Sequence, residues 1–207
     1  MTALIIDTSS ENSLVGISEG KSLLYAFIAP HGNNLSRSLL PSILEALEKT
    51  TASLDYIAAG MGPGSYTGTR VGATVAKTLS FAWNIPLIPF CSLLCFLPEI
   101  KGRFGCLMPA KSGNCYLLKG DLKNEKVSIT LSSLLEPEET FAACRDCDYI
   151  ATSHSSTLPD PFSSASFKRI DFQPNLKAPT LYALNEFLLG NTLSSHAGEM
   201  IYLHSPS

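Results

Sequence analysis

The first half of the chain consists of short apolar runs interrupted by two longer helical patterns. The runs predict strands near residues 3–7, 13–18, 22–29, 56–60 and 85–89, and helices near 35–49 and from about residue 67. The expected element order is therefore β-β-β-α-β-α-β.

After Pro98 a second, shorter series of the same kind begins. It predicts strands near 104–110, 114–119, 126–131 and 148–152, and helices near 137–144 and 179–190. Residues 155–179 are rich in Ser and Pro and predict an irregular loop, and a tail follows from Ser194. The repeated element order predicts two subdomains, residues 1–98 and 99–207, with the last helix packing back on the first.

The helix near 35–49 carries an apolar stripe at four-residue spacing, formed by Leu35, Leu39, Ile43 and Leu47. Such a stripe covers a sheet or meets a partner. Pro41 falls inside the stripe and removes one helical hydrogen bond, so it predicts a kink or a late start of the helix.

A glycine-rich loop links the strand near 56–60 to the next helix. It comprises Gly62, Pro63, Gly64, Ser65, Tyr66, Thr67 and Gly68. One interpretation is a tight turn with a closely packed helix behind it, and the other is an anion site made by free N–H groups. The loop lacks the Gly-Lys-Ser/Thr of a P-loop and the glycine spacing of a dinucleotide fingerprint.

Small residues recur every four positions in the helix after the loop, at Gly68, Gly72, Ala76 and Ser80. The two glycines cost about 1 kcal/mol each relative to alanine, so close packing has to offset them. That packing is either inside the protein's own core or a helix-to-helix seam with a partner chain. The seam predicts that Ala76→Trp leaves the chain folded but abolishes the complex.

Composition narrows the functional classes. The chain has 207 residues, is 45% hydrophobic and carries a net charge of −3, without a block of basic residues. It is large enough to bury a core but lacks the charge of an independent nucleic-acid binder. The N-terminal residues indicate neither secretion nor membrane insertion, so we expect a cytoplasmic protein.

The candidate metal ligands are sparse. Of the six cysteines, only Cys144 and Cys147 have a recognised spacing, and one pair cannot complete a tetrahedral zinc site. None of the four histidines is paired at i, i+4. We therefore expect six reduced, mostly buried thiols, no metal and no cofactor.

Four motifs together resemble the bacterial TsaB (YeaZ) family. They are Ile5-Ile6-Asp7-Thr8-Ser9, His31 ahead of Leu39-Leu40-Pro41, the string from Gly62 to Gly72 that includes Thr69-Arg70-Val71, and Ile85-Pro86-Leu87-Ile88-Pro89. The resemblance is dense over residues 1–98. Beyond them, the main positions that match the family are Tyr116 and Tyr202-Leu203.

The resemblance implies an α/β fold of the actin-like, sugar-kinase-like (ASKHA) kind, with two ribonuclease-H-like subdomains. It also implies a non-catalytic scaffold in the synthesis of threonylcarbamoyladenosine beside the tRNA anticodon. The implied partners are a TsaD-like catalytic paralogue and a TsaE-like ATPase, with tRNA bound only through the complex. Pairing of the chain with itself is a further expectation when the partner is absent.

The catalytic paralogue carries a His-x-x-x-His metal pair shortly after an Ile-Pro-like strand. The matching positions here are Ser92 and Phe96, so the resemblance implies that the metal site is absent. Where relatives usually have Asp-Ala-Arg, this chain has Pro109-Ala110-Lys111, which puts any acidic function there in doubt.

Two groups of site residues follow from the resemblance. The expected partner contacts are His31, Leu39, Gly68, Arg70, Gly72, Ala76 and Ser80. Asp7, Thr8 and Ser9 are either a vestigial nucleotide site or, for Asp7, a cap on the turn into the second strand. The alternative function is an active actin-like ATPase or glycoprotease-like hydrolase, which requires turnover by the isolated chain.

Overall fold

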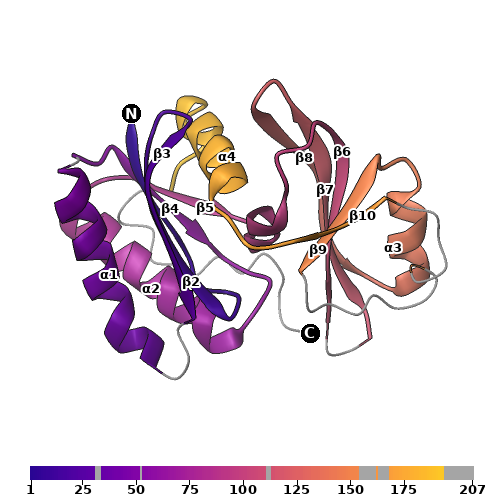
Figure 1. The fold of residues 1–207 in the computed structure, drawn as a ribbon, viewed down its shortest axis with the longest axis horizontal. Helices are drawn as coiled ribbons and strands as arrows, with labels where there is room; N and C mark the ends of the chain where they lie inside the picture. Colours follow the sequence, from indigo (N-terminus) through magenta and orange to yellow (C-terminus); the bar gives the residue numbers. More distant parts are fainter. Residues whose placement is uncertain (31–33, 52, 111–112, 154–161, 163–167, 194–207) are drawn as a thin grey trace. The chain divides into compact units, whose positions relative to one another are not determined.

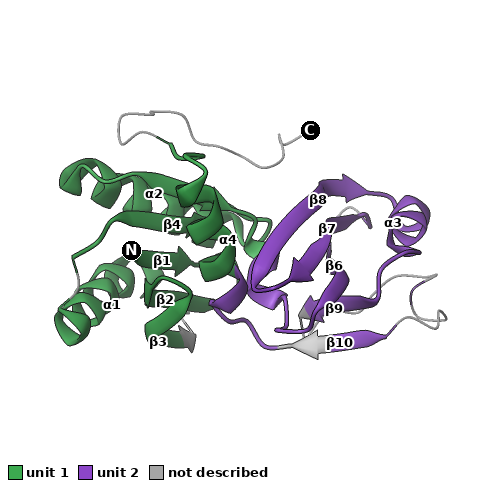
Figure 2. Ribbon diagram, turned by 90° about the horizontal axis from the view of Figure 1, so that it is seen from above, with its two compact units in different colours: residues 1–92, 179–203 green, residues 93–178, 204–207 purple. Residues whose placement is uncertain are grey.

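The computed structural model describes residues 1–30, 34–51, 53–110, 113–153, 162 and 168–193. The chain divides into two compact units, shown in green and purple in Figure 2. Among the described residues, unit 1 comprises Met1–Ser92 and those from Pro179 onward, and unit 2 comprises those from Leu93 to Ala178. Unit 1 is thus built from two separate stretches of the sequence.

Unit 1 contains a five-stranded sheet in the order β3-β2-β1-β4-β5 (Figure 1). Its elements are β1 (Thr2–Asp7), β2 (Asn12–Glu19), β3 (Ser22–Pro30), α1 (Leu35–Thr50), β4 (Tyr56–Gly60), α2 (Tyr66–Trp83), β5 (Leu87–Phe90) and most of α4 (Lys177–Leu188). The pairs β1/β2 and β2/β3 are antiparallel, and β1/β4 and β4/β5 are parallel. Parallel neighbours need crossovers, which α1 and α2 supply.

Successive apolar side chains of the strands point to opposite sides, so both faces of this sheet are apolar. Leu4, Ile6 and Ile57 point into a core that α1 and α2 cover. Tyr56 points to the opposite face, where its ring stacks on Phe187 of α4 with centroids 4.4 Å apart. Successive side chains of a strand point to opposite sides, so helices on both faces account for the nearly continuous burial of β1 and β4.

The course of helix α1 bears on the second of the two effects expected for Pro41, a kink or a late start. It begins at Leu35 and runs through Pro41 to Thr50, so the predicted late start is wrong. Pro41 lies on the exposed side, where water can satisfy the carbonyl that loses its hydrogen bond. The buried residues are Leu35, Leu39, Ile43 and Ala46, so the stripe covers the sheet.

Unit 2 repeats the topology. Its elements are most of η2 (Ser92–Phe96), β6 (Gly102–Pro109), β7 (Cys115–Lys123), β8 (Lys126–Leu135), α3 (Pro137–Cys144), β9 (Tyr149–Ser153) and β10 (Arg169–Phe172). The sheet order β10-β9-β6-β7-β8 is that of the first sheet once β6 is equated with β1. Two mixed sheets with the same strand order confirm the expected α/β fold with two ribonuclease-H-like subdomains.

Strand β10 falls in the stretch that was expected to be irregular, so that prediction is wrong for Arg169–Phe172. The segment pairs in parallel with β9 over four residues. Strand formation here depends on the neighbouring strand, which local sequence does not reveal. Among the helices that the structure describes, none is long and apolar enough to span a bilayer.

Candidate functional site

The glycine-rich loop between β4 and α2 is fastened to the turn that follows β1. The amide of Ser65 donates to the carbonyl of Ser9 at 2.6 Å. The hydroxyl of Thr8 donates to the carbonyl of Gly68 at 2.7 Å. The loop and the turn are therefore one packed structure.

Three glycines allow this close approach. A Cβ added at Gly64 would overlap the carbonyl of Ser9, and one at Gly68 would overlap the carbonyl of Thr8. At Gly72 it would overlap the Thr8 hydroxyl oxygen. Backbone and hydroxyl groups thus occupy the space where side chains would stand.

Several loop amides that could hold an anion already have acceptors within the chain. Ser65 is the N-cap of α2, and its hydroxyl accepts from the amide of Gly68 at 3.2 Å. The amide of Gly62 donates to the hydroxyl of Ser92 at 3.0 Å. Capping by Ser65 satisfies a helix N-terminal donor that an anion would otherwise bind. The geometry therefore favours the tight-turn interpretation over an anion site.

Asp7 is the most unusual ionisable group of this region, because it is only 1% exposed. Its Oδ1 accepts from the amide of Ser9 at 3.0 Å and from the Ser9 hydroxyl at 2.8 Å. Its Oδ2 lacks a hydrogen bond of good geometry and packs against Gly60. Burial raises the pKa of Asp7, and the hydroxyls of Ser92 and Ser9 oppose that rise.

These contacts match the capping role expected for Asp7. Thr8 and Ser9 are also nearly fully buried. A vestigial nucleotide site at Asp7, Thr8 and Ser9 stays a prediction, because these contacts within unit 1 do not test nucleotide binding.

The ridge of small residues on α2 faces the core of unit 1. Gly68, Gly72, Ala76 and Ser80 are all buried, and the hydroxyl of Ser80 donates to the carbonyl of Ile85 at 2.6 Å. Leu39 of α1 is 1% exposed. These five residues, named above as partner contacts, are covered by the chain's own fold. The structure favours the core interpretation for them and leaves Arg70 as the exposed member of that set.

A different side of α2 is exposed. Tyr66 is 68% exposed, and the guanidinium of Arg70 lies over its ring, 3.7 Å from the centroid. Phe81, near the end of the same helix, is 62% exposed. The aromatic ring and the cation form a pre-arranged pair on the helix surface.

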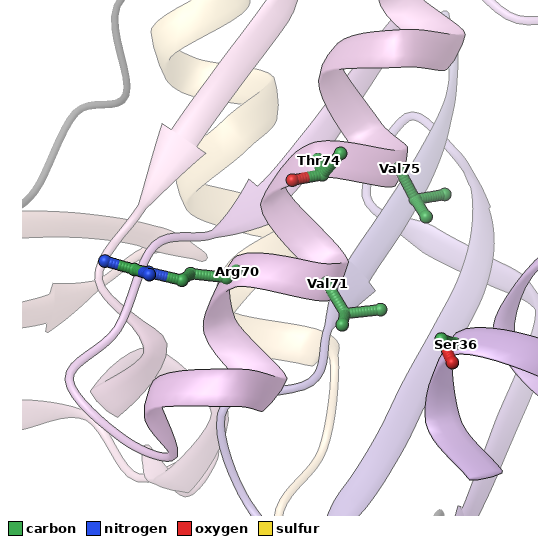
Figure 3. A pocket seen from close by; sticks show the side chains of 5 residues that line it. All are labelled: Ser36, Arg70, Val71, Thr74 and Val75. Atoms are coloured by element: carbon green, nitrogen blue, oxygen red, sulfur yellow. The ribbon is translucent and has the colours of Figure 1, made fainter.

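A shallow hollow of about 310 Å³ lies between α1 and α2, lined by Ser36, Arg70, Val71, Thr74 and Val75. Figure 3 shows Val71 and Val75 pointing from α2 toward the helix that carries Ser36. Leu40 and Leu44 follow Ser36 at four-residue spacing and are 43% and 47% exposed. We call Leu40, Leu44, Tyr66, Arg70, Thr74 and the hollow the α1–α2 face.

The sequence predicts only part of this face. Arg70 was expected as a partner contact and Tyr66 as a residue of the glycine-rich loop, whereas Leu40, Leu44 and Thr74 were not expected to be contacts. The available signal was the position of Leu40 and Leu44 beside the buried stripe of α1. His31, the remaining expected contact, lies outside the described residues.

The positions that match the metal pair of the catalytic paralogue are both buried. Ser92 accepts the Gly62 hydrogen bond, and Phe96 is 5% exposed. Among the described residues, no group of three or more His, Cys, Asp or Glu side chains is placed to hold a metal ion. Five of the six cysteines are buried and Cys147 is half-buried, as expected.

Comparison with known sequences points to one family. Residues 30–147 match the family model described as TsaD, tRNA N6-adenosine threonylcarbamoyltransferase. A protein of Haemophilus influenzae named tRNA threonylcarbamoyladenosine biosynthesis protein TsaB is 39% identical over 101 residues, which cover 45% of this chain and 40% of that protein. The Bacillus subtilis protein of the same name is 34% identical over 122 residues, covering 56% and 53%. The chain therefore spans about half the length of the curated relatives it matches.

Solved structures show the fold over nearly the whole chain. YeaZ from Pseudomonas aeruginosa superposes with a TM-score of 0.70 at 19% identity, covering 98% of this chain and 99% of that one. A Pseudomonas aeruginosa protein described as similar to peptidase YEAZ gives 0.72 at 18% identity, with the same coverage.

Proposed function

The chain belongs to the TsaD family, and from this premise we propose that it is a non-catalytic subunit of the TsaB kind. It binds a TsaD-like paralogue and is required for threonylcarbamoyl transfer to the adenosine next to the tRNA anticodon. A TsaE-like ATPase acts in the same complex, in the cytoplasm.

The observation that carries the proposal is the α1–α2 face. Large apolar side chains exposed together are typical of protein interaction sites. Tyr66 and Arg70 are residue types that dominate binding energy at such sites, and their stacking reduces the side-chain freedom lost on binding. The hollow beside them accepts a side chain of the partner rather than a whole ligand, because it is shallow and lined by only five residues.

The partly buried neighbours of this face support a helix-to-helix contact. Val71 and Val75 lie between the core and the hollow, so the face is anchored in packed structure. A rigid face binds with less ordering of side chains than a loop does. We propose that helices of the TsaD-like paralogue pack on α1 and α2, and that a second copy of this chain takes their place when the paralogue is absent.

The non-catalytic role rests on Ser92 and Phe96. Neither side chain can replace an imidazole ligand, and the Ser92 hydroxyl is engaged by the Gly62 amide inside unit 1. The net charge of −3 likewise favours tRNA binding through the complex rather than by this chain alone.

The test is threonylcarbamoyl transfer to tRNA by the purified TsaD-like paralogue and ATPase, with threonylcarbamoyl-adenylate, in the presence and absence of this chain. We expect transfer only in its presence. Equal transfer without it, by components shown to be competent, would refute the proposal. Hydrolysis of ATP or peptide by the chain alone would instead favour the actin-like ATPase or glycoprotease alternative.

A further inference from the structure

Two thiols meet at the end of α3 in unit 2, apart from the α1–α2 face. Cys144 is the last residue of α3 and is fully buried, and Cys147 is half-buried. The amide of Cys147 donates to the carbonyl of Cys144 at 2.9 Å. A turn closed in this way holds its end Cα atoms within about 7 Å, and disulfides span about 4.4–6.8 Å between Cα atoms.

The side chains converge as well. A Cβ built on Gly105 of β6 would lie 3.3 Å from the sulfur of Cys144 and 3.6 Å from that of Cys147. Both sulfur atoms therefore lie over one point of the sheet, in space that the missing side chain of Gly105 leaves open. The two thiols are also hydrogen-bonded to each other.

The two thiols differ in pKa because of the hydrogen bond between them, burial and nearby charges. The hydrogen bond from Cys144 lowers the pKa of Cys147, and the Lys119 ammonium and the Arg103 guanidinium lower it further, whereas burial and Asp146 oppose them. The same hydrogen bond, together with burial, raises the pKa of Cys144. Cys147 is therefore the more acidic thiol of the pair, and Cys144 is the buried, less acidic one.

Two contacts hold the Lys119 ammonium, which lowers the pKa of Cys147. Its ammonium donates to the carbonyl of Ala143 at 2.8 Å and to the carboxylate of Asp146. Tyr149 is a further titratable neighbour; burial raises its pKa, so it is neutral near pH 7. A fixed cation beside a half-exposed thiolate is the setting of a reactive rather than a structural cysteine.

We propose that Cys144 and Cys147 form a redox-reactive dithiol, a modification site that a low-molecular-weight disulfide such as oxidised glutathione converts to an intramolecular disulfide. The Cys147 thiolate attacks one sulfur of the small disulfide and expels one small thiolate, which leaves a mixed disulfide on Cys147. The expelled thiolate takes the proton of Cys144. The Cys144 sulfur then attacks the Cys147 sulfur and expels the second thiolate, so that one disulfide is reduced while the dithiol is oxidised.

The test is incubation of the full chain with oxidised glutathione, followed by acid quenching, alkylation and peptide mass spectrometry. We expect a bond between Cys144 and Cys147, with Cys91, Cys95, Cys106 and Cys115 still alkylated as free thiols. Cys144→Ala should stop at the glutathione adduct on Cys147, and Cys147→Ala should give neither product. The matched control Cys106→Ala should form the disulfide like the unmodified chain.

Failure of the Cys144–Cys147 bond to form in the unmodified chain, under conditions that oxidise a control dithiol, would overturn the proposal. A second readout is the rate of alkylation of Cys147 at pH 7. We expect Lys119→Met to slow it by about three- to tenfold and to shift its pH dependence upward, and Lys119→Arg to restore it. An unchanged pH profile for Lys119→Met would remove Lys119 from the site.

Discussion

The two faces of α2 obey different constraints. On the buried face, Gly68 and Gly72 lie against Thr8, with no space for a larger side chain. On the exposed face, Tyr66 and Arg70 stack on each other above the helix surface. A ridge of small residues therefore shows that another segment packs closely on the helix, but it does not show which one. In this protein the segment is the turn that follows β1.

The comparison predicts that substitutions on the two faces separate stability from binding. Changes on the buried face should lower the free energy of unfolding. Changes on the exposed face should not alter the free energy of unfolding but should weaken the proposed complex.

The largest effect is expected for Ala76→Trp. Ala76 is 0% exposed, so the indole has no room, and overpacking should lower the free energy of unfolding by more than about 3 kcal/mol. This replaces the expectation that the variant stays folded. Thr74→Trp, on the exposed face, is the matched control and should change stability by less than about 0.5 kcal/mol. Urea unfolding monitored by circular dichroism measures both, and a normally stable Ala76→Trp would contradict the burial of the ridge.

Gly72→Ala should have the next largest effect, a loss of about 1–3 kcal/mol, because its methyl group meets the Thr8 hydroxyl. The same substitution made in a Thr8→Ala background should be neutral, or stabilising by up to about 1 kcal/mol through helix propensity. A double-mutant cycle in urea measures the coupling. Additive effects would show that the hydroxyl is not what requires glycine at this position.

Asp7→Asn should have a smaller effect of opposite sign. Burial raises the pKa of Asp7 in the folded chain above its ordinary value of 3.8. The favourable contribution of the neutral acid is therefore complete below pH 3.8 and is lost as the pH rises through the folded pKa. Asparagine keeps an Oδ1 acceptor for Ser9 and has no charge to bury. We expect Asp7→Asn and the unmodified chain to have equal melting temperatures near pH 3, and Asp7→Asn to have the higher one near pH 8. A constant difference in melting temperature across this pH range would argue against a buried acid.

The smallest effect on stability is expected for Thr74→Arg on the α1–α2 face. Thr74 is exposed and lines the hollow, so the free energy of unfolding should change by less than about 0.5 kcal/mol. Binding to the TsaD-like paralogue should weaken at least tenfold, about 1.4 kcal/mol, when calorimetry measures the affinity. Ser128→Arg, an exposed position of unit 2, is the control. Equal affinity of the two variants would place the contact elsewhere.

Periodicity predicted most of the elements because their apolar faces are buried as expected, for example the stripe of α1 and the runs of β1 and β4. Strand β10 was missed because its four residues become a strand only beside β9. The α1–α2 face was largely missed for a similar reason. The spacing of residues within one helix does not show which side of that helix a second helix leaves open.

The discontinuity of unit 1 has a consequence for the newly made chain. Helix α4 covers the face of the sheet that carries Tyr56, yet the ribosome makes α4 only after every strand of unit 2. That apolar face therefore stays uncovered by α4 while β6 to β10 are synthesised. Unit 2 can fold before unit 1 is complete. All the strands of unit 2 are therefore made before the last helix of unit 1.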